Sequence, residues 1–315
     1  MEIAMGRAPS PRPIFTNKFS IFHRFYYFCI RKVPFTMKRK HLFCELGPTA
    51  YAISLNKQII TRKIRNLISD RRLARLCEPD PAEGFPTVVY AHRSSMIKRG
   101  PGIDMQFQLN KVRNIALACS RIDGVVIRPG ETFSFWHLVG RTSRANGFAP
   151  GRVLANGRLV AGVGGGLCNL ANTLHILFMH SPLTVVELHH HSDALVPDPG
   201  GVRIPYSAGT SVNYNFLDLR FRNDTDRPVR LLARCEGDDL VAELRTTRPF
   251  STEYRIVEEN HHFHLAENGS YYRLSRIYRE TVDRATGRIL ARELKWDNRS
   301  RVMFDPALLP ADQIR

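Results

Sequence analysis

Apolar residues recur at helical spacing in the first half of the chain. From Asn56 to Leu76, isoleucines and leucines have seven basic residues between them, which predicts a basic amphipathic helix or helix pair. We expect it to pack on the main domain with its basic face in solvent. Residues 105–121 predict a second helix with an apolar side, where Cys119 is expected to be a small core residue. Residues 87–99 predict a strand between the two helices.

The hydrophobic period changes to two in the second half. Residues 211–223, 229–237 and 240–246 alternate in this way and are separated by turn signals, so they predict an antiparallel meander. Asn-Gly at 268–269 and Thr-Gly at 286–287 predict two further hairpins in the tail. We therefore predict an α+β fold, in which a few helices pack against an antiparallel sheet.

Positive charge is concentrated near the N-terminus. The formal net charge is +17, and residues 1–36 hold six Lys and Arg against one acid, while residues 37–78 hold ten against three. Twelve of the seventeen charges thus lie in the first 78 residues. The rest of the chain has the ordinary mixed charge of a protein surface, so we predict no nucleic-acid partner. A weak contact of the basic N-terminus with a membrane surface is the alternative for this charge.

These patterns divide the chain into four parts. They are a poorly ordered basic and aromatic extension (1–36), a basic helical segment (37–78), an α+β core (87–248) and a C-terminal β-hairpin region (249–315). The six cysteines are widely spaced without a CxxC pair, which indicates neither a disulfide framework nor a zinc ribbon. No secretory signal is recognised, so we predict a cytoplasmic or membrane-peripheral protein. The oligomeric state is not predicted.

The stretch GVGGGLCN, residues 162–169, precedes an apolar helix predicted over residues 170–180. Glycines let the backbone turn sharply and approach a ligand closely. A cysteine at a helix N-terminus has a lowered pKa and becomes a better nucleophile. Cys168 is therefore the candidate nucleophile. A dinucleotide site is not indicated, since Leu167 stands where the third glycine of GxGxxG would fall.

Three consecutive histidines follow that helix in VVELHHHS, residues 185–192. If this segment returns as a strand, His189 and His191 point to one face and His190 to the other. One of His189 and His191 is then the expected base, and Asp193 or Asp198 would orient its imidazole.

Two other interpretations of the same residues stay open. His189 and His191 could hold zinc together with Cys168, His180 or an aspartate, although our leading prediction contains no metal or cofactor. Alternatively, the glycine turn and the histidines line a ligand pocket without turnover. The candidate ligand-binding residues are Gly164, Gly165, Gly166, Asn169, Thr210 and Ser211.

Four runs together resemble the VanW family. They are GVVIRPGETFSFWHLVG (124–140), NGFAPG (146–151), the glycine–cysteine–histidine stretch (162–192) and GTSVNYNFLDLRFRNDTDRP (209–228). The resemblance extends from about residue 37 to residue 304. It departs from the family at Asn169, where the family usually has Gln, and in YSAGTS at 206–211, where Phe-Gly-Thr-Gly-Thr-Ser is usual.

The resemblance implies a role in glycopeptide resistance or cell-envelope metabolism. Our leading hypothesis is a thiol-dependent acyl transferase or hydrolase acting on peptidoglycan-precursor peptides or a similar small molecule. The alternative is an accessory protein that binds such a ligand without turnover. Whether the chain is an enzyme stays open at this point.

Overall fold

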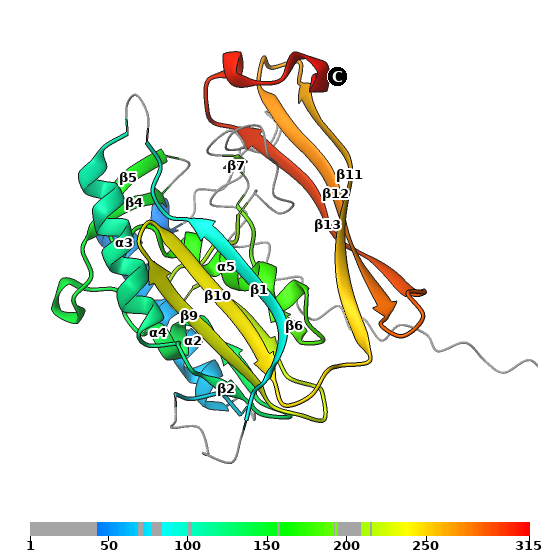
Figure 1. The fold of residues 1–315 in the computed structure, drawn as a ribbon. Helices are drawn as coiled ribbons and strands as arrows, with labels where there is room; N and C mark the ends of the chain where they lie inside the picture. Colours follow the sequence, from blue (N-terminus) through cyan, green and yellow to red (C-terminus); the bar gives the residue numbers. More distant parts are fainter. Residues whose placement is uncertain are drawn as a thin grey trace, which may run out of the picture.

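The computed structural model describes residues 43–68, 72–76, 84–99, 103–155, 158–191, 193–194, 209–214 and 216–315. The extension predicted over residues 1–36 lies outside these ranges. Within them, helices are few and the sheets are mostly antiparallel, so the fold is α+β (Figure 1). None of the helices in these ranges is long and apolar enough to cross a membrane.

A four-stranded core sheet carries two helices. Its strand order is β1-β10-β9-β2, and all neighbours are antiparallel. The alternate residues of β9 and β10 are buried, as the period of two predicts. Helix α3 packs against β9, and helix α5 packs against β1 and β10. The bounds are β1 Thr87–Ser95, β2 Val126–Ile127, β9 Val229–Glu236, β10 Asp239–Thr246, α3 Met105–Cys119 and α5 Leu167–Met179.

A three-stranded sheet corrects the predicted meander. Its order is β3-β8-β6, with β3 Thr132–Ser134, β8 Arg220–Arg222 and β6 Thr184–Glu187. The first segment of the meander therefore pairs with β3 and β6, and only β9 and β10 form a hairpin. The reason lies in Asn223, which is fully buried and donates from Nδ2 to Ile127 O and Arg227 O. These bonds hold the turn after β8 and separate β8 from β9.

A second four-stranded sheet, called the long sheet here, stands beside the core sheet (Figure 1). Strands β11 and β12, and β12 and β13, form the two hairpins predicted at Asn268-Gly269 and Thr286-Gly287. The C-terminus lies at the upper end of this sheet in Figure 1. The bounds are β7 Asp193–Ala194, β11 Thr252–Leu265, β12 Tyr271–Asp283 and β13 Ile289–Val302.

The remaining elements are short or lie at the edges of the core. Strands β4 and β5 form an isolated hairpin, and α4 follows β3 directly. Their bounds, with those of the 3-10 helices, are β4 Pro150–Ala155, β5 Arg158–Val163, α4 Phe135–Val139, η1 Phe43–Glu45, η2 Arg144–Asn146, η4 Pro306–Leu308 and η5 Ala311–Gln313.

The first long helix, α2, differs from its prediction in extent. It runs over Pro48–Ile68, so it begins and ends earlier than the predicted segment from Asn56 to Leu76. Residues 72–76 are extended instead. Ala74 N donates to Thr132 O at 2.9 Å and Thr132 N donates to Arg72 O at 2.8 Å. Because Ala74 is fully buried beside β3, this strand-like pairing replaces the last predicted helical turns.

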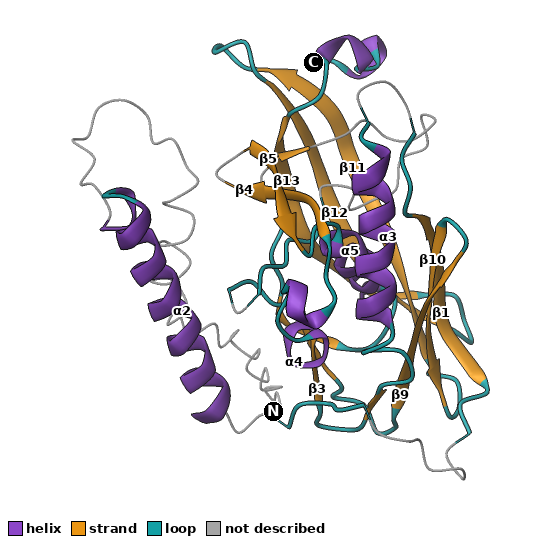
Figure 2. Ribbon diagram, turned by 90° about the vertical axis from the view of Figure 1, so that its left-hand side faces the viewer, coloured by secondary structure: helices purple, strands orange, loops and turns teal. Residues whose placement is uncertain are grey.

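Helix α2 is only partly covered by the core. Figure 2 shows it at one side of the molecule, apart from the other helices. None of its residues is buried, and Ile60, Ile64 and Leu67 are exposed. Leu55, Ile59 and Arg62 are half-buried, and Arg62 forms an ion pair with Glu187 of β6. Lys57, Lys63 and Arg65 are exposed, so most of the basic face lies in solvent and Arg62 is the exception.

The contribution of Glu187 to stability depends on pH, because its pKa is shifted in the folded protein. Burial alone would raise its pKa, but the hydrogen bond with His189 and the charges of Arg62 and Arg220 outweigh burial and bring the pKa to about 2. A carboxyl with a depressed pKa in the folded state stabilises the fold above its unfolded pKa and loses this contribution as pH falls toward the folded value.

We therefore expect the free energy of unfolding, measured with urea, to fall by about 3 kcal/mol between pH 4.5 and pH 2 on account of Glu187. In Glu187→Gln this part of the pH dependence should be missing. The control is Glu267→Gln, which changes an exposed carboxyl in the β11–β12 turn and should leave the wild-type slope. Equal slopes in all three proteins would contradict the assignment.

Candidate functional site

Helix α5 runs between the core sheet and the long sheet and carries the candidate chemistry. Ten of its thirteen residues are buried, which is typical of a helix packed on more than one side. Leu170, Leu174 and Phe178 join the main core, whereas Ile176 packs with Ile277 of the long sheet. The side chains of α5 therefore pack against two different parts of the molecule, the main core and the long sheet.

The glycines before α5 are explained by close packing. Gly164 and Gly166 have φ values of +83° and +100°, which side chains rarely adopt. Gly165 has an ordinary φ, but a Cβ on it would lie 2.3 Å from the carbonyl carbon of Gly151 in β4. The turn thus requires glycine at three consecutive positions for reasons of backbone conformation and space. Their predicted role in ligand binding stays a prediction.

Asn114 of α3 fixes this turn, and the sequence analysis missed it. It is fully buried, and its Nδ2 donates to Ala149 O at 3.0 Å and to Gly165 O at 2.9 Å. Its Oδ1 accepts from Ala149 N at 2.8 Å. The only signal in the sequence is an asparagine among the inward-facing positions of a predicted helix.

Cys168 is the second residue of α5 and is held as a hydrogen-bond donor. Its Sγ lies 3.7 Å from Val212 O, so the thiol keeps its proton to make this contact. Cys168 is half-buried, and desolvation by its neighbours raises its pKa, which the contact with the Val212 carbonyl only partly opposes. The lowered pKa that we expected from the helix N-terminus is therefore wrong for this environment.

The three histidines diverge. Strand β6 ends at Glu187, so they do not continue it as expected. His189 Nε2 lies 3.0 Å from Glu187 Oε1, and the ring of His190 stacks on Trp296 with centroids 3.8 Å apart. His191 lies against Gly209. Among the described residues, the hydrogen bond of Cys168 goes to Val212 O and not to one of these histidines.

Of the two aspartates predicted to orient a histidine, the structure describes one. Asp193 begins β7, which pairs in parallel with β13 at Arg301. Burial lowers the pKa of His191, and the charge of Asp193 acts in the opposite direction. Asp198 lies outside the described residues. The described ranges contain no group of three His, Cys, Asp or Glu side chains able to hold a metal ion, so they offer no set of ligands for the alternative zinc site.

A buried imidazole in the middle of α5 was missed. His175 Nδ1 lies 3.0 Å from Thr210 Oγ1, and its ring centroid is 5.6 Å from that of His190. Burial lowers the pKa of His175 to about 3 and that of His190 to about 4, so both are neutral at pH 7. Thr210 is fully buried, and Ser211 N donates to His189 O at 2.8 Å. A histidine on an apolar helix, seven residues after Cys168, was the available signal.

Asn169 is the last of the predicted ligand-binding residues. It lies on the first turn of α5 beside Cys168. Its Oδ1 is buried and accepts no hydrogen bond from the described residues. The structure therefore places Asn169 with the glycine turn, and Thr210 and Ser211 with the histidines.

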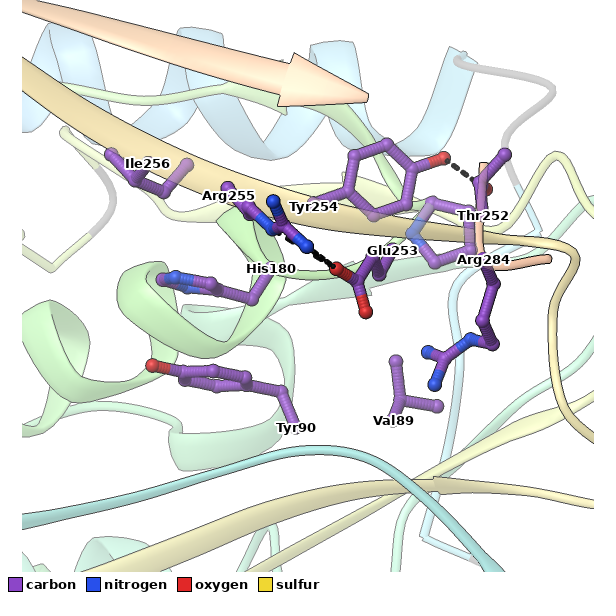
Figure 3. A pocket seen from close by; sticks show the side chains of 10 residues that line it. Val89, Tyr90, His180, Thr252, Glu253, Tyr254, Arg255, Ile256 and Arg284 are labelled. Atoms are coloured by element: carbon purple, nitrogen blue, oxygen red, sulfur yellow. Dashed lines mark hydrogen bonds and ion pairs between the residues drawn. The ribbon is translucent and has the colours of Figure 1, made fainter. Parts of the chain in front are cut away.

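A cavity of about 450 Å³ lies at the C-terminal end of α5 (Figure 3). One wall is Tyr90 of β1, stacked on His180 with ring centroids 3.8 Å apart and planes 5° from parallel. His180 Nδ1 lies 2.8 Å from Ile176 O, which fixes the ring. The opposite wall is residues 252–256 of β11, and Arg284 extends into the space from the β12–β13 turn. The core sheet, α5 and the long sheet thus all contribute to this cavity.

Comparisons with known proteins support the resemblance to the VanW family. A family model described as "VanW like protein" matches residues 110–245. The vancomycin B-type resistance protein VanW of Enterococcus faecalis is 28% identical over 220 residues, which cover 70% of this chain and 79% of that protein. The uncharacterized protein YoaR of Bacillus subtilis is 30% identical over 150 residues, covering 47% and 48%. No solved structure matches the chain significantly.

The packing of the glycine turn predicts the effect of Gly165→Ala. The new methyl group meets backbone atoms of Gly151, which cannot rotate away, so we expect a loss of roughly 2 kcal/mol or more in the free energy of unfolding. Gly84→Ala is the control, because the nearest atom to its Cβ is 3.9 Å away, and it should stay within about 0.5 kcal/mol of wild type. Similar stability of both variants in urea denaturation would contradict this explanation of the glycines.

The environment of Cys168 predicts slow alkylation. Because burial raises its pKa, iodoacetamide at pH 7 should modify Cys168 more slowly than it modifies glutathione in the same solution. The rate should rise only at a pH above the ordinary thiol range. Peptide mass spectrometry over a pH series measures both rates. Rapid modification of Cys168 near pH 6 would show an activated thiolate instead.

Proposed function

Because the chain belongs to the VanW family, we propose that it is an accessory protein of glycopeptide resistance or cell-envelope metabolism that binds a peptide-like ligand without turnover. The relative from Enterococcus faecalis is named for vancomycin resistance, which supports the cellular context. The observation that carries the binding role is the cavity at the C-terminal end of α5.

The position of the cavity is typical of a ligand site. Ligand pockets occur preferentially between structural units and measure about 300–1,000 Å³. This cavity has about 450 Å³ and is lined by both the core sheet and the long sheet. Its stacked Tyr90 and His180 form a flat wall, which suits an apolar or planar part of a ligand. A ligand held here would contact both sheets at once.

The charged groups of the cavity indicate the chemistry of the ligand. Arg255 is paired with Glu253, its Nε and Nη2 lying 3.0 and 2.6 Å from Oε1. Arg284 is exposed and, among the described residues, has no ion-pair partner. In Figure 3 its guanidinium group extends toward Val89. An arginine in this position fits the carboxylate of a peptide, such as a peptidoglycan-precursor peptide.

The state of Cys168 favours binding over thiol catalysis. A nucleophilic cysteine needs a lowered pKa or an adjacent base. Here burial raises the pKa of Cys168, and its described partner is the carbonyl of Val212. His175 is one to two helical turns farther along α5 and is bonded to Thr210. Thiol-dependent acyl transfer is therefore the second candidate, supported by the place of Cys168 on the first turn of α5.

Binding of a soluble muramyl pentapeptide, measured by isothermal titration calorimetry, tests the proposal. We expect Arg284→Gln to weaken binding roughly tenfold, because it removes a charge-assisted pairing with the ligand carboxylate. Arg288→Gln is the matched control, since Arg288 is exposed in the same β12–β13 turn but does not line the cavity. Cys168→Ser should bind as the wild type does.

Product analysis of the same mixtures separates the two candidates. A binding protein should leave the pentapeptide intact in wild type and Cys168→Ser alike. Release of an amino acid by the wild type that Cys168→Ser abolishes would establish thiol catalysis instead. Equal affinity of Arg284→Gln and wild type would exclude this cavity as the site.

A further inference from the structure

A second hollow, which shares no lining residue with the cavity at the C-terminal end of α5, lies between α2 and the three-stranded sheet. It is a cleft of about 900 Å³, called the cationic cleft here. Its lining comes from α2, residues 72–75, the loop after β2, α4 and the start of β8. Six of the lining residues are cationic, namely Arg62, Lys63, Arg72, Arg75, Arg128 and Arg220. Glu131 and Asp218 are the acidic ones.

Part of this charge is neutralised by the buried carboxylate of Asp218 and the half-buried carboxylate of Glu187. Arg220 Nε lies 2.6 Å from Asp218 Oδ2, and Arg62 is ion-paired with Glu187. Counting Glu187 with the two acidic lining residues leaves three positive charges in excess among the described residues. The excess positive charge lies on exposed residues of the cleft.

Three exposed cations of the cleft have no acidic partner in the described ranges. Arg72 and Arg75 are exposed, as is Lys63 of α2, and none of the three is ion-paired with a carboxylate of the described chain. His137 lies between them and β8. Burial lowers its pKa, and the charges of Arg75 and Arg220 lower it further against the opposite effect of Asp218. The cleft therefore has a positive potential that Asp218 does not cancel.

The inner end of the cleft is aromatic and rigid. Trp136 is almost buried and donates from Nε1 to Leu217 O at 2.7 Å. The ring of Tyr214 meets it edge-on, with centroids 5.7 Å apart. These rings meet at a right angle and form an apolar corner beside the cationic residues, against which the organic part of an anionic ligand can pack.

We propose that the cationic cleft binds a phosphate ester or diphosphate, with its phosphoryl oxygens on Lys63, Arg72 and Arg75 and its organic part against Trp136 and Tyr214. The planar fork of arginine matches phosphate oxygens in a bidentate manner. A phosphate monoester carries about two negative charges at pH 7, and a diphosphate carries more, which suits an excess of three. A single carboxylate would leave most of this excess uncompensated. This site is independent of the peptide-binding role proposed above.

The phosphoryl group can belong to a soluble molecule or to a lipid. Leu67 lines the cleft and is 84% exposed, and Ile68 beside it is 75% exposed. An acyl chain would cover these side chains, whereas a soluble diphosphate would leave them in water. A lipid phosphate and a soluble phosphate ester would make the same phosphoryl contacts, but only the lipid would also contact Leu67 and Ile68.

Inorganic pyrophosphate is the first probe, titrated into the full chain by calorimetry. We expect Arg72→Gln/Arg75→Gln to bind it roughly tenfold more weakly or worse, because two charge-assisted contacts are lost. Both side chains are exposed, so the fold should be unaffected, which circular dichroism checks. Arg276→Gln/Arg301→Gln is the control, with the same change of charge at exposed positions of the long sheet.

Sedimentation with phosphatidylcholine vesicles, with and without phosphatidic acid, distinguishes the lipid source. Binding that needs phosphatidic acid and is lost both in Arg72→Gln/Arg75→Gln and in Leu67→Ser/Ile68→Ser indicates a lipid phosphate. Pyrophosphate binding without vesicle binding indicates a soluble phosphate ester. Absence of binding to both probes, or equal losses in the cleft variant and the control, would overturn the proposal.

Discussion

The buried carboxylate of Asp218 is the constraint that joins the separate parts of the fold. It is 2% exposed, accepts from Ser134 Oγ at 2.6 Å and Trp136 N at 3.0 Å, and pairs with Arg220. A buried charge without partners costs several kcal/mol, so these donors must stay together. They belong to β3, α4 and β8, and Arg62 of α2 approaches the same carboxylate to 3.8 Å. One side chain thereby fixes the relative positions of the three-stranded sheet, α4 and α2, and with them the walls of the cationic cleft.

Helix α5 imposes the second constraint, because it is apolar on nearly all sides. The core sheet covers one side, and Ile277 and Trp296 of the long sheet cover part of the other. Arg279 of the long sheet adds a hydrogen bond to Ser181 O at 2.5 Å, just beyond the helix. Both sheets also line the cavity at the C-terminal end of α5. The cavity therefore depends on how α5 is held between the two sheets.

Local patterns predicted those elements whose partners lie nearby in the sequence. The alternation in 229–246 and the turns at 268–269 and 286–287 gave hairpins, since such turns determine the pairing of adjacent strands. The basic face of α2 was predicted to be solvated, and Arg62 is the exception, because periodicity does not show that one basic residue meets a carboxylate 125 residues away. The candidate site shows the same limit. The glycine turn before α5 was located, but its need for glycine arises from Gly151, and the partner of His175 is Thr210.

The glycine–cysteine stretch shows why a sequence pattern alone does not separate packing from catalysis. The same three glycines would be needed to bring a ligand close to the backbone or to bring β4 close to it, and here β4 occupies the space at Gly165. The helix N-terminus favours a thiolate at Cys168, but desolvation of a buried charge is the larger effect, and the Val212 carbonyl accepts the proton that a nucleophile would have to lose. Desolvation of Cys168 therefore supports the binding role proposed above over thiol catalysis, and it depends on the segment around Val212, which lies 44 residues beyond the cysteine in sequence.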